Sequence, residues 1–266
     1  MAQAGNQEEF DLPLDPAPSE NLGSVWCVLL AGGSGQRFGS LKQFDSLAGV
    51  RVIDRSARTA AAACDGVVAV LPADSLATPD GQIPDATAVV AGGASRSDSV
   101  RAGLAAIPAE ATVILVHDAA RPLATAELFA RVIAQVQSGV SAVVPAVQVV
   151  DTIRVVNPDS NGSASEGSDS AGSDRAGSDS PGPDSAVIDR DLLRAVQTPQ
   201  GFQAALLRRA YDSDGEATDD AGLVEALGVK ITLIDGERSN LKLTERADRI
   251  IAAALLESVD PDPQLD

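Results

Sequence analysis

The chain has 266 residues, 44% of them hydrophobic, which is enough for one large α/β domain or two small ones. Its formal net charge of −18 is concentrated in residues 1–22, 157–185 and 257–266, so the rest of the chain can hold a local basic pocket. The sequence has no basic stripe, 3% aromatic residues and no apolar run long enough to cross a bilayer, which argues against nucleic-acid and membrane partners. Two cysteines, Cys27 and Cys64, and one histidine, His117, form neither a disulfide framework nor a zinc pattern. We therefore expect buried thiols in a cytoplasmic protein.

Short apolar runs alternate with helical stretches from residue 25 onward. The pattern predicts strands at 25–30, 66–71, 88–92, 111–116, 141–147 and 230–236. It predicts helices at 50–63, 96–107, 125–136, 204–212, 218–227 and 244–259. This alternation indicates an α/β fold of Rossmann-like type, with a mostly parallel sheet covered by helices on both faces. In such sheets the ligand lies beyond the carboxyl ends of the strands.

Three segments do not fit this pattern. Residues 1–22 are acidic and contain three prolines, which predicts a disordered tail. Residues 157–185 repeat "GSD" three times and have no apolar side chain larger than alanine or proline, which predicts a flexible insert. With a second short tail at 259–266, one domain is expected over residues 23–258.

A glycine-rich turn follows the first predicted strand. The stretch "AGGSGQRFGSLK" ends in two cations, Arg37 and Lys42. Glycines allow backbone N–H groups to approach phosphate oxygens closely, and such donors bind anions. The stretch lacks the Gly-Lys-Ser/Thr ending of a P-loop, and Phe38 stands where a dinucleotide fingerprint ends in a small residue. The cations favour a triphosphate site, and the alternative is a tight β–α turn without a ligand.

Several blocks of sequence narrow the interpretation. "LLAGGSGQRFGSLKQF" resembles the signature loop of the nucleotidyltransferases that activate sugar and polyol phosphates. Further blocks resemble the 2-C-methyl-D-erythritol 4-phosphate cytidylyltransferase family: "AGGASRSDSVRAGL", "ILVHDAARP", "VVDTI", "DRDLLRAVQTPQGF", "TDDAGLVE" and "NLKLT". The resemblance runs from about residue 25 to 255 outside the insert. A ribitol 5-phosphate cytidylyltransferase, another sugar-phosphate or polyol-phosphate nucleotidyltransferase and an inactive nucleotide-sensing module are the alternatives.

The resemblance implies a single domain of the nucleotide-diphospho-sugar transferase type with a protruding β-arm at about 147–190. In this family the arm interlocks a homodimer. The implied reaction is the transfer of CMP from CTP to methylerythritol phosphate, with Mg²⁺ and release of pyrophosphate. Nucleotidyl transfer depends on in-line positioning and on the cancellation of negative charge more than on proton chemistry.

The resemblance also assigns roles to individual residues. The implied catalytic cations are Arg37, Lys42, Arg190 and Lys242. The implied CTP-binding residues are Ala31, Gly32, Gly33, Ser34, Gly35, Gly93, Ala94 and Ser99, of which the last three read the cytosine. The implied residues for the polyol phosphate are Arg121, Thr152, Arg190, Thr198 and Thr218, and Thr152 and Arg190 come from the partner subunit. Asp118 is the implied Mg²⁺ ligand.

Some assignments leave alternatives open. Arg37 and Lys42 are closer together than is usual in the family, and Leu41 replaces the customary proline, so the segment around Lys42 departs from the family pattern. Arg121 serves either the substrate or Asp118. Ser99 could simply belong to a capped helix start. We expect His117 to be structural, because the attacking phosphate is already an anion and needs no base.

Overall fold

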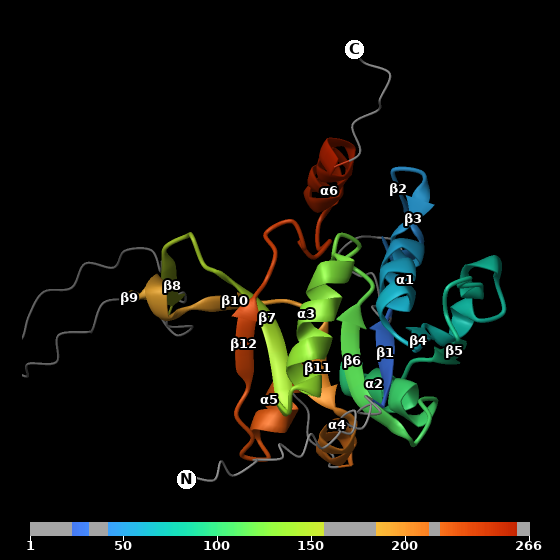
Figure 1. Ribbon diagram of the computed structural model, residues 1–266. Coiled ribbons are helices and arrows are strands. Elements are labelled where there is room, and N and C mark those ends of the chain that lie inside the picture. Colours follow the sequence, from blue (N-terminus) through green and yellow to red (C-terminus); the bar gives the residue numbers. More distant parts are fainter. Residues whose placement is uncertain (1–22, 32–41, 157–184, 213–218, 260–266) are drawn as a thin grey trace, which may run out of the picture.

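The computed structural model describes residues 23–31, 42–156, 185–212 and 219–259. Its centre is an eight-stranded sheet in the order β10-β7-β11-β6-β1-β4-β5, with β12 also paired to β7 (Figure 1). The strands are β1 Ser24–Leu30, β4 Gly66–Leu71, β5 Ala88–Ala91, β6 Ala111–Asp118, β7 Ala142–Gln148, β10 Arg194–Val196, β11 Gln200–Gln203 and β12 Thr232–Asp235. The β1–β4, β1–β6, β4–β5 and β7–β12 pairs are parallel. The predicted mostly parallel sheet is thus confirmed.

Helices cover both faces of this sheet, as predicted. They are α1 Val52–Ala63, α2 Arg96–Ala105, α3 Ala126–Gln137, α4 Ala204–Tyr211, α5 Asp220–Glu225 and α6 Arg246–Val259. Apolar residues of α1 and α3 form one core with the sheet, and those of α2, α4 and α5 form the second core on the opposite face. Helix α6 lies beyond the edge of the sheet, where Ala252 packs with Leu47 and Leu243 (Figure 1). Among the described helices, none is long and apolar enough to cross a bilayer.

Strand β11 is an element that the pattern of apolar residues did not predict. Its four residues, "QGFQ", pair antiparallel with β6 and with β7, and β10 also pairs antiparallel with β7. A Cβ atom on Gly201 would lie 2.4 Å from Cγ1 of Val132 in α3, so the helix can approach this strand only over a glycine. Tertiary packing, not local propensity, places the strand there.

Two small hairpins complete the described fold. Strands β2, Ser46–Leu47, and β3, Val50–Arg51, pair with each other, so the predicted helix at 50–63 begins two residues later than expected. Strands β8, Ile153–Val156, and β9, Ser185–Ile188, form an arm that projects away from the main sheet (Figure 1). This arm lies within the predicted range 147–190. The predicted tail 1–22, residues 157–184 of the predicted insert and residues 260–266 lie outside the described part of the chain.

The parallel arrangement brings two strand ends together. Leu30 and Asp118, the last residues of β1 and β6, are paired in register. The N–H of Ala119 continues the pairing by donating to the Leu30 carbonyl oxygen at 2.9 Å. Carboxyl ends of neighbouring parallel strands form the ligand-binding edge of such sheets. Asp118 therefore lies where the sequence predicts a site.

His117 supports this edge from inside the core. Its ring is fully buried and packs edge-on against Phe129 of α3, with ring centroids 5.1 Å apart. Nδ1 shares a 3.0 Å hydrogen bond with the hydroxyl of Thr198, and the same hydroxyl accepts the backbone N–H of Asp118 at 3.0 Å. Burial lowers the pKa of His117 to about 4, although the carboxylate of Asp118 opposes this shift. A buried, neutral histidine is a structural element, as the sequence predicts.

This burial predicts a pH-dependent stability. Between about pH 4 and 6.5 the unfolded chain holds a proton on His117 that the folded chain rejects, so the free energy of unfolding rises with pH in this window. From pH 5 to pH 7 the increase from this group is about 2 kcal/mol. Urea unfolding of the wild type and of His117→Gln measures it, and the variant should lack this part of the slope. Parallel pH profiles for the two proteins would contradict the prediction.

Candidate active site

A cavity of about 230 Å³ opens at the carboxyl edge of β1 and β6. Its described lining brings together residues from both ends of the sequence: Leu30, Ala31, Lys42, Gln43, Arg96, Ser99, Asp118, Ala120 and Lys242. Three of these side chains are cations, and Asp118 is the one acidic residue in this lining. A pocket with this balance of charge suits an anionic ligand.

Asp118 and Lys242 form the central ion pair of the cavity. Nζ of Lys242 lies 2.7 Å from Oδ2 of Asp118. The side chain of Lys242 is 45% exposed and that of Asp118 is 14% exposed. Burial alone would raise the pKa of Asp118, but the positive charges of Lys242 and Arg96 lower it below its usual value. Asp118 is therefore a carboxylate at neutral pH, with its charge directed into the pocket.

The loop that carries Lys242 is held in place by buried amides. The side chain of Gln197 donates to the carbonyl oxygen of Glu237 at 2.7 Å and accepts the N–H of Glu237 at 3.0 Å. Asn240, which is fully buried, donates to the Thr198 carbonyl oxygen at 2.9 Å. The N–H of Leu243 donates to the Ala120 carbonyl oxygen at 2.8 Å. Neither Gln197 nor Asn240 was singled out from the sequence, because each acts on a segment about 40 residues away.

Lys42 reaches the same loop from the other end of the chain. It begins the 3₁₀ turn η1, Lys42–Phe44, and its Nζ donates to the carbonyl oxygen of Leu243 at 2.6 Å. Two lysines that are 200 positions apart in sequence, Lys42 and Lys242, thus line one cavity. This convergence is what the resemblance implied for these two residues.

The start of α2, next to a second glycine turn, forms one wall of the cavity. The Ser99 hydroxyl accepts the N–H of Gly93 at 3.2 Å and donates to the Ser95 carbonyl oxygen at 3.0 Å. A Cβ atom on Gly93 would lie 2.2 Å from Cβ of Asp98, so only glycine fits beside the capping box of α2. Ser99 lines the cavity, whereas Gly93 and the exposed Ala94 lie just outside its lining. Both interpretations of Ser99 are thus compatible, because it holds the helix start and faces the pocket.

Arg96, which the sequence did not single out, also lines the cavity. Its NH1 and NH2 groups donate to Oδ1 and Oδ2 of Asp220 at 3.0 and 2.6 Å. Asp220 is fully buried and also accepts the hydroxyl of Tyr211 at 2.5 Å. The sequence offers no local signal for this cluster, since Asp220 lies 124 positions from Arg96.

The remaining predicted residues lie elsewhere. Arg121 donates to the carbonyl oxygens of Asn240 and Val196 at 2.7 and 3.3 Å, so it anchors the loop of Lys242. Thr198 is buried against His117 and Asp118. Thr152 and Arg190 are exposed on or beside the arm, where Arg190 donates to the Val150 carbonyl oxygen at 2.7 Å. The predicted residues outside the described chain are Gly32, Gly33, Ser34, Gly35, Arg37 and Thr218.

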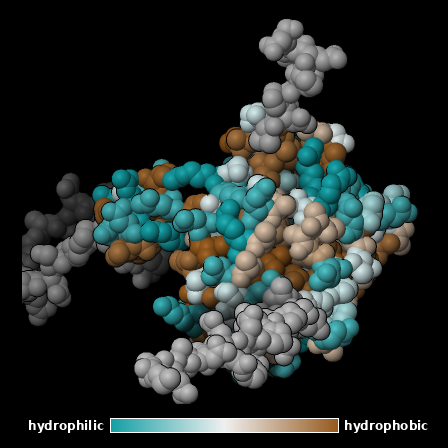
Figure 2. All heavy atoms as spheres, in the orientation of Figure 1, coloured by the Kyte–Doolittle hydropathy of each residue, from teal (hydrophilic) through white to brown (hydrophobic). Residues whose placement is uncertain are grey.

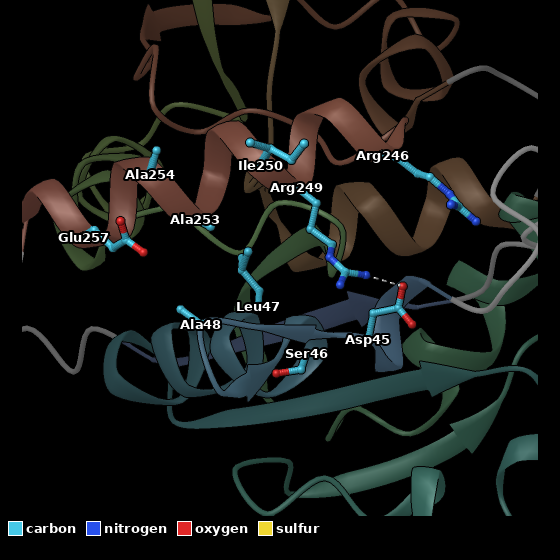
Figure 3. Close-up of a pocket in the computed structure, with 10 residues that line it drawn as sticks. All are labelled: Asp45, Ser46, Leu47, Ala48, Arg246, Arg249, Ile250, Ala253, Ala254 and Glu257. Atoms are coloured by element: carbon cyan, nitrogen blue, oxygen red, sulfur yellow. Dashed lines mark hydrogen bonds and ion pairs between the residues drawn. The ribbon is translucent and has the colours of Figure 1, made fainter.

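A larger cavity, about 770 Å³, lies between the β2–β3 hairpin and α6 (Figure 3). An ion pair of 2.9 Å joins Asp45, just after η1, to Arg249 of α6. None of the predicted site residues lines this cavity. The ion pair attaches α6 to the segment that follows Lys42, and so helps to fix one wall of the smaller cavity.

Comparison with known proteins agrees with this geometry. The family model described as 2-C-methyl-D-erythritol 4-phosphate cytidylyltransferase matches residues 25–176 and 178–258. The chain is 40% identical over 244 residues to the protein of that name from Rhodococcus opacus, covering 90% of this chain and 98% of the relative. It is 39% identical over 245 residues to the one from Nocardia farcinica, covering 90% and 96%.

A solved structure shows the same fold. The crystal structure of 2-C-methyl-D-erythritol 4-phosphate cytidylyltransferase from Thermus thermophilus superimposes with a TM-score of 0.66 at 30% identity, covering 86% of this chain and 98% of that one. The family match spans nearly all of the described chain, including both segments that carry Lys42 and Lys242. The chain therefore belongs to the 2-C-methyl-D-erythritol 4-phosphate cytidylyltransferase family.

Proposed function

We propose that this chain transfers CMP from CTP to 2-C-methyl-D-erythritol 4-phosphate and releases pyrophosphate. The observation that carries the proposal is the convergence of Lys42, Asp118 and Lys242 on one cavity at the carboxyl edge of the sheet. Family membership supplies the identity of the two substrates. The described lining of the pocket has three cations and one carboxylate, so it suits a reaction between two phosphate anions.

The reaction needs charge cancellation more than it needs a base. A phosphate oxygen of the acceptor forms a new bond to the α-phosphorus of CTP, and the bond from that phosphorus to the pyrophosphate oxygen breaks. Both reacting groups are anions, so Lys42 and Lys242 lower their repulsion and stabilise the charge that develops. Arg37 joins them in this proposal. The attacking oxygen carries no proton at neutral pH, and His117 is buried away from the cavity.

The nucleotide base lies toward α2 in this proposal. Gly93, Ala94 and Ser99 read the cytosine through backbone groups and one hydroxyl, and Ala31 begins the loop that holds the phosphates. The hydroxyl of Ser99 donates its proton to Ser95 and accepts the N–H of Gly93, so its oxygen presents a remaining lone pair at a constant depth. A rigid edge of this kind favours a pyrimidine over a larger purine.

Mg²⁺ fits the site as an ion that binds together with the nucleotide. The described residues contain no cluster of three or more His, Cys, Asp or Glu side chains that could hold a metal ion. Asp118 offers one hard carboxylate, which suits Mg²⁺ that keeps phosphate and water oxygens as its other ligands. When bound, the ion would neutralise phosphate charge and polarise the reacting phosphoryl group. Asp118 would hold it, and Lys242, which lies beside that carboxylate, would be available to the acceptor phosphate.

A homodimer completes the site in this proposal. Thr152 and Arg190 bind the polyol phosphate of the partner subunit's site, together with Arg121, Thr198 and Thr218 of the chain that binds CTP. The β8–β9 hairpin is separate from the main sheet, and an isolated two-stranded hairpin is marginally stable in water. Figure 2 shows apolar surface in the region of this hairpin. The exposed large apolar side chains there are Val150, Val155, Val187 and Leu192. A partner subunit that covers them stabilises the arm.

A cytoplasmic location is the last part of the proposal. Cys27 and Cys64 are both free thiols, which suits a reducing compartment.

The activity is tested with purified protein, CTP, Mg²⁺ and 2-C-methyl-D-erythritol 4-phosphate. We expect pyrophosphate and the cytidine diphosphate conjugate to form in equal amounts. Replacing CTP by ATP should lower kcat/KM by at least about a hundredfold, as expected when polar groups that read the base are left unpaired. Replacing the acceptor by ribitol 5-phosphate should also lower kcat/KM. CTP binding without turnover would instead identify a nucleotide-sensing module.

Asp118→Asn tests the role of the carboxylate. The amide has the same size but loses the ion pair with Lys242 and the charge for Mg²⁺, so kcat/KM should fall by about a hundredfold or more. Asp85→Asn is the control, because it alters an ion-paired carboxylate outside the cavity, 3.8 Å from Arg58. Unchanged turnover in Asp118→Asn at saturating Mg²⁺ would remove Asp118 from the catalytic site.

Leu192→Asp tests the dimer. Leu192 is 81% exposed, so the change costs little within one chain but places a charge in the proposed interface. We expect light scattering to show a monomer, and kcat/KM for methylerythritol phosphate to fall by about tenfold or more because the arm of the partner is lost. Ile250→Asp, at a 74% exposed position on α6, should leave both properties unchanged. A dimeric, fully active Leu192→Asp protein would refute the proposed interface.

A further inference from the structure

Arg96 is the cation of the cavity that the proposed function has not used. It is the first residue of α2, and it lines the cavity together with Ser99, one turn further along the same helix. Its side chain is 30% exposed, so part of the guanidinium is open to the pocket. Asp118 lines the same cavity, and the charge of Arg96 contributes to the lowered pKa of that carboxylate.

A buried carboxylate fixes the orientation of this guanidinium. Asp220, at the start of α5, is fully buried and receives both terminal nitrogens of Arg96, at 3.0 and 2.6 Å. Tyr211, at the end of α4, donates its hydroxyl to Oδ1 of Asp220. Residues of three helices therefore determine one side-chain position, and a bidentate pair holds the plane of the guanidinium as well as its distance.

The pair leaves binding capacity on the pocket side. A guanidinium has five N–H donors, and the two hydrogen bonds to Asp220 use two of them. Burial acts to lower the pKa of Arg96, but the hydrogen bonds and the charge of Asp220 raise it, so the group stays protonated. A preorganised guanidinium loses little conformational entropy when it binds a further acceptor.

We infer that Arg96 is a further binding residue of this site, which contacts the triphosphate of the nucleotide, and that Asp220 and Tyr211 are its positioning residues. The inference rests on the proposed function for the identity of the ligand. Phosphate is favoured over the base because Arg96 lines the same cavity of about 230 Å³ as Asp118, Lys42 and Lys242, the residues that the proposed function assigns to the phosphates. Three cations against one carboxylate in the described lining suit an anionic ligand.

The simpler interpretation is that the Arg96–Asp220 pair only joins α2 to α5. In that case its removal would affect stability and not ligand binding. The chain offers a matched control in Arg101, which is also on α2, also 30% exposed and also paired with a carboxylate, Asp98, at 3.0 Å. Arg101 lines a different cavity, beside Arg208 and Tyr211.

The test measures two probes by titration calorimetry: inorganic tripolyphosphate with Mg²⁺, and cytidine. We expect Arg96→Gln to weaken tripolyphosphate binding by about tenfold, as for loss of a charged hydrogen bond, and to leave cytidine binding within about twofold. Arg101→Gln should change neither. Wild-type affinity in Arg96→Gln, an equal loss for both probes, or an equal loss in Arg101→Gln would overturn the inference, as would a wild-type chain that does not bind tripolyphosphate.

Because Arg96→Gln leaves the buried Asp220 without its cation, a second variant separates folding from binding. The double variant Arg96→Gln/Asp220→Asn removes both charges, so it should recover thermal stability while tripolyphosphate binding stays weak. Recovery of both properties would show a purely structural pair. Tyr211→Phe should give a smaller loss of tripolyphosphate affinity, of about two- to threefold, with the ion pair retained; unchanged affinity would exclude Tyr211 as a positioning residue.

Tripolyphosphate carries neither a base nor a transferable group, so this result is independent of turnover. A chain that binds tripolyphosphate through Arg96 but forms no product would refute the proposed function alone. A chain that forms product while Arg96→Gln binds tripolyphosphate normally would refute the role of Arg96 alone.

Discussion

The ion pair between Asp118 and Lys242 is the constraint on which the rest of the site depends. It joins the end of β6 to a loop near the carboxyl end of the chain, at 2.7 Å. That loop has no regular secondary structure to fix it, so side chains do so instead. Gln197 and Arg121 donate to carbonyl oxygens of the loop, and Asn240 of the loop donates to the Thr198 carbonyl oxygen. These hydrogen bonds hold the lysine at the sheet edge.

Placing several cations in one small cavity without a ligand costs free energy unless each cation has a hydrogen-bond acceptor. Lys42 donates to the carbonyl oxygen of Leu243, Arg96 is bound by Asp220, and Lys242 by Asp118. The three acceptors differ in how readily they can be replaced. A partly exposed lysine can leave its partner when a phosphate arrives, whereas the bidentate pair with a fully buried carboxylate persists. The pocket thus combines two cations that can move with one that is fixed.

The elements and site residues that depend on a local sequence pattern were predicted, and those that depend on contacts between distant segments were missed. The parallel strands are runs of valine, leucine and alanine with breaks on either side, and all of them were predicted within a few residues. Strand β11 was missed because its glutamines and glycine have low strand propensity, and its place between β6 and β7 is decided by packing against α3. Likewise, Lys42, Ser99, Asp118 and Lys242 follow from family motifs, whereas Arg96 gains its orientation from Asp220, far away in sequence.

In the proposed function the site has two parts of different rigidity. The part proposed to bind the nucleotide consists of the ends of β1 and β6, the start of α2 and the Lys242 loop, which are tied to the core by short hydrogen bonds. Thr152 and Arg190 lie beside the β8–β9 arm, which is not part of the main sheet. If the nucleotide binds on a rigid edge and the acceptor is bound by a separate arm, the site is complete only when the arm is supported. The two described strands of the arm are too few to bury their own apolar side chains, which is a physical reason for the proposed second subunit.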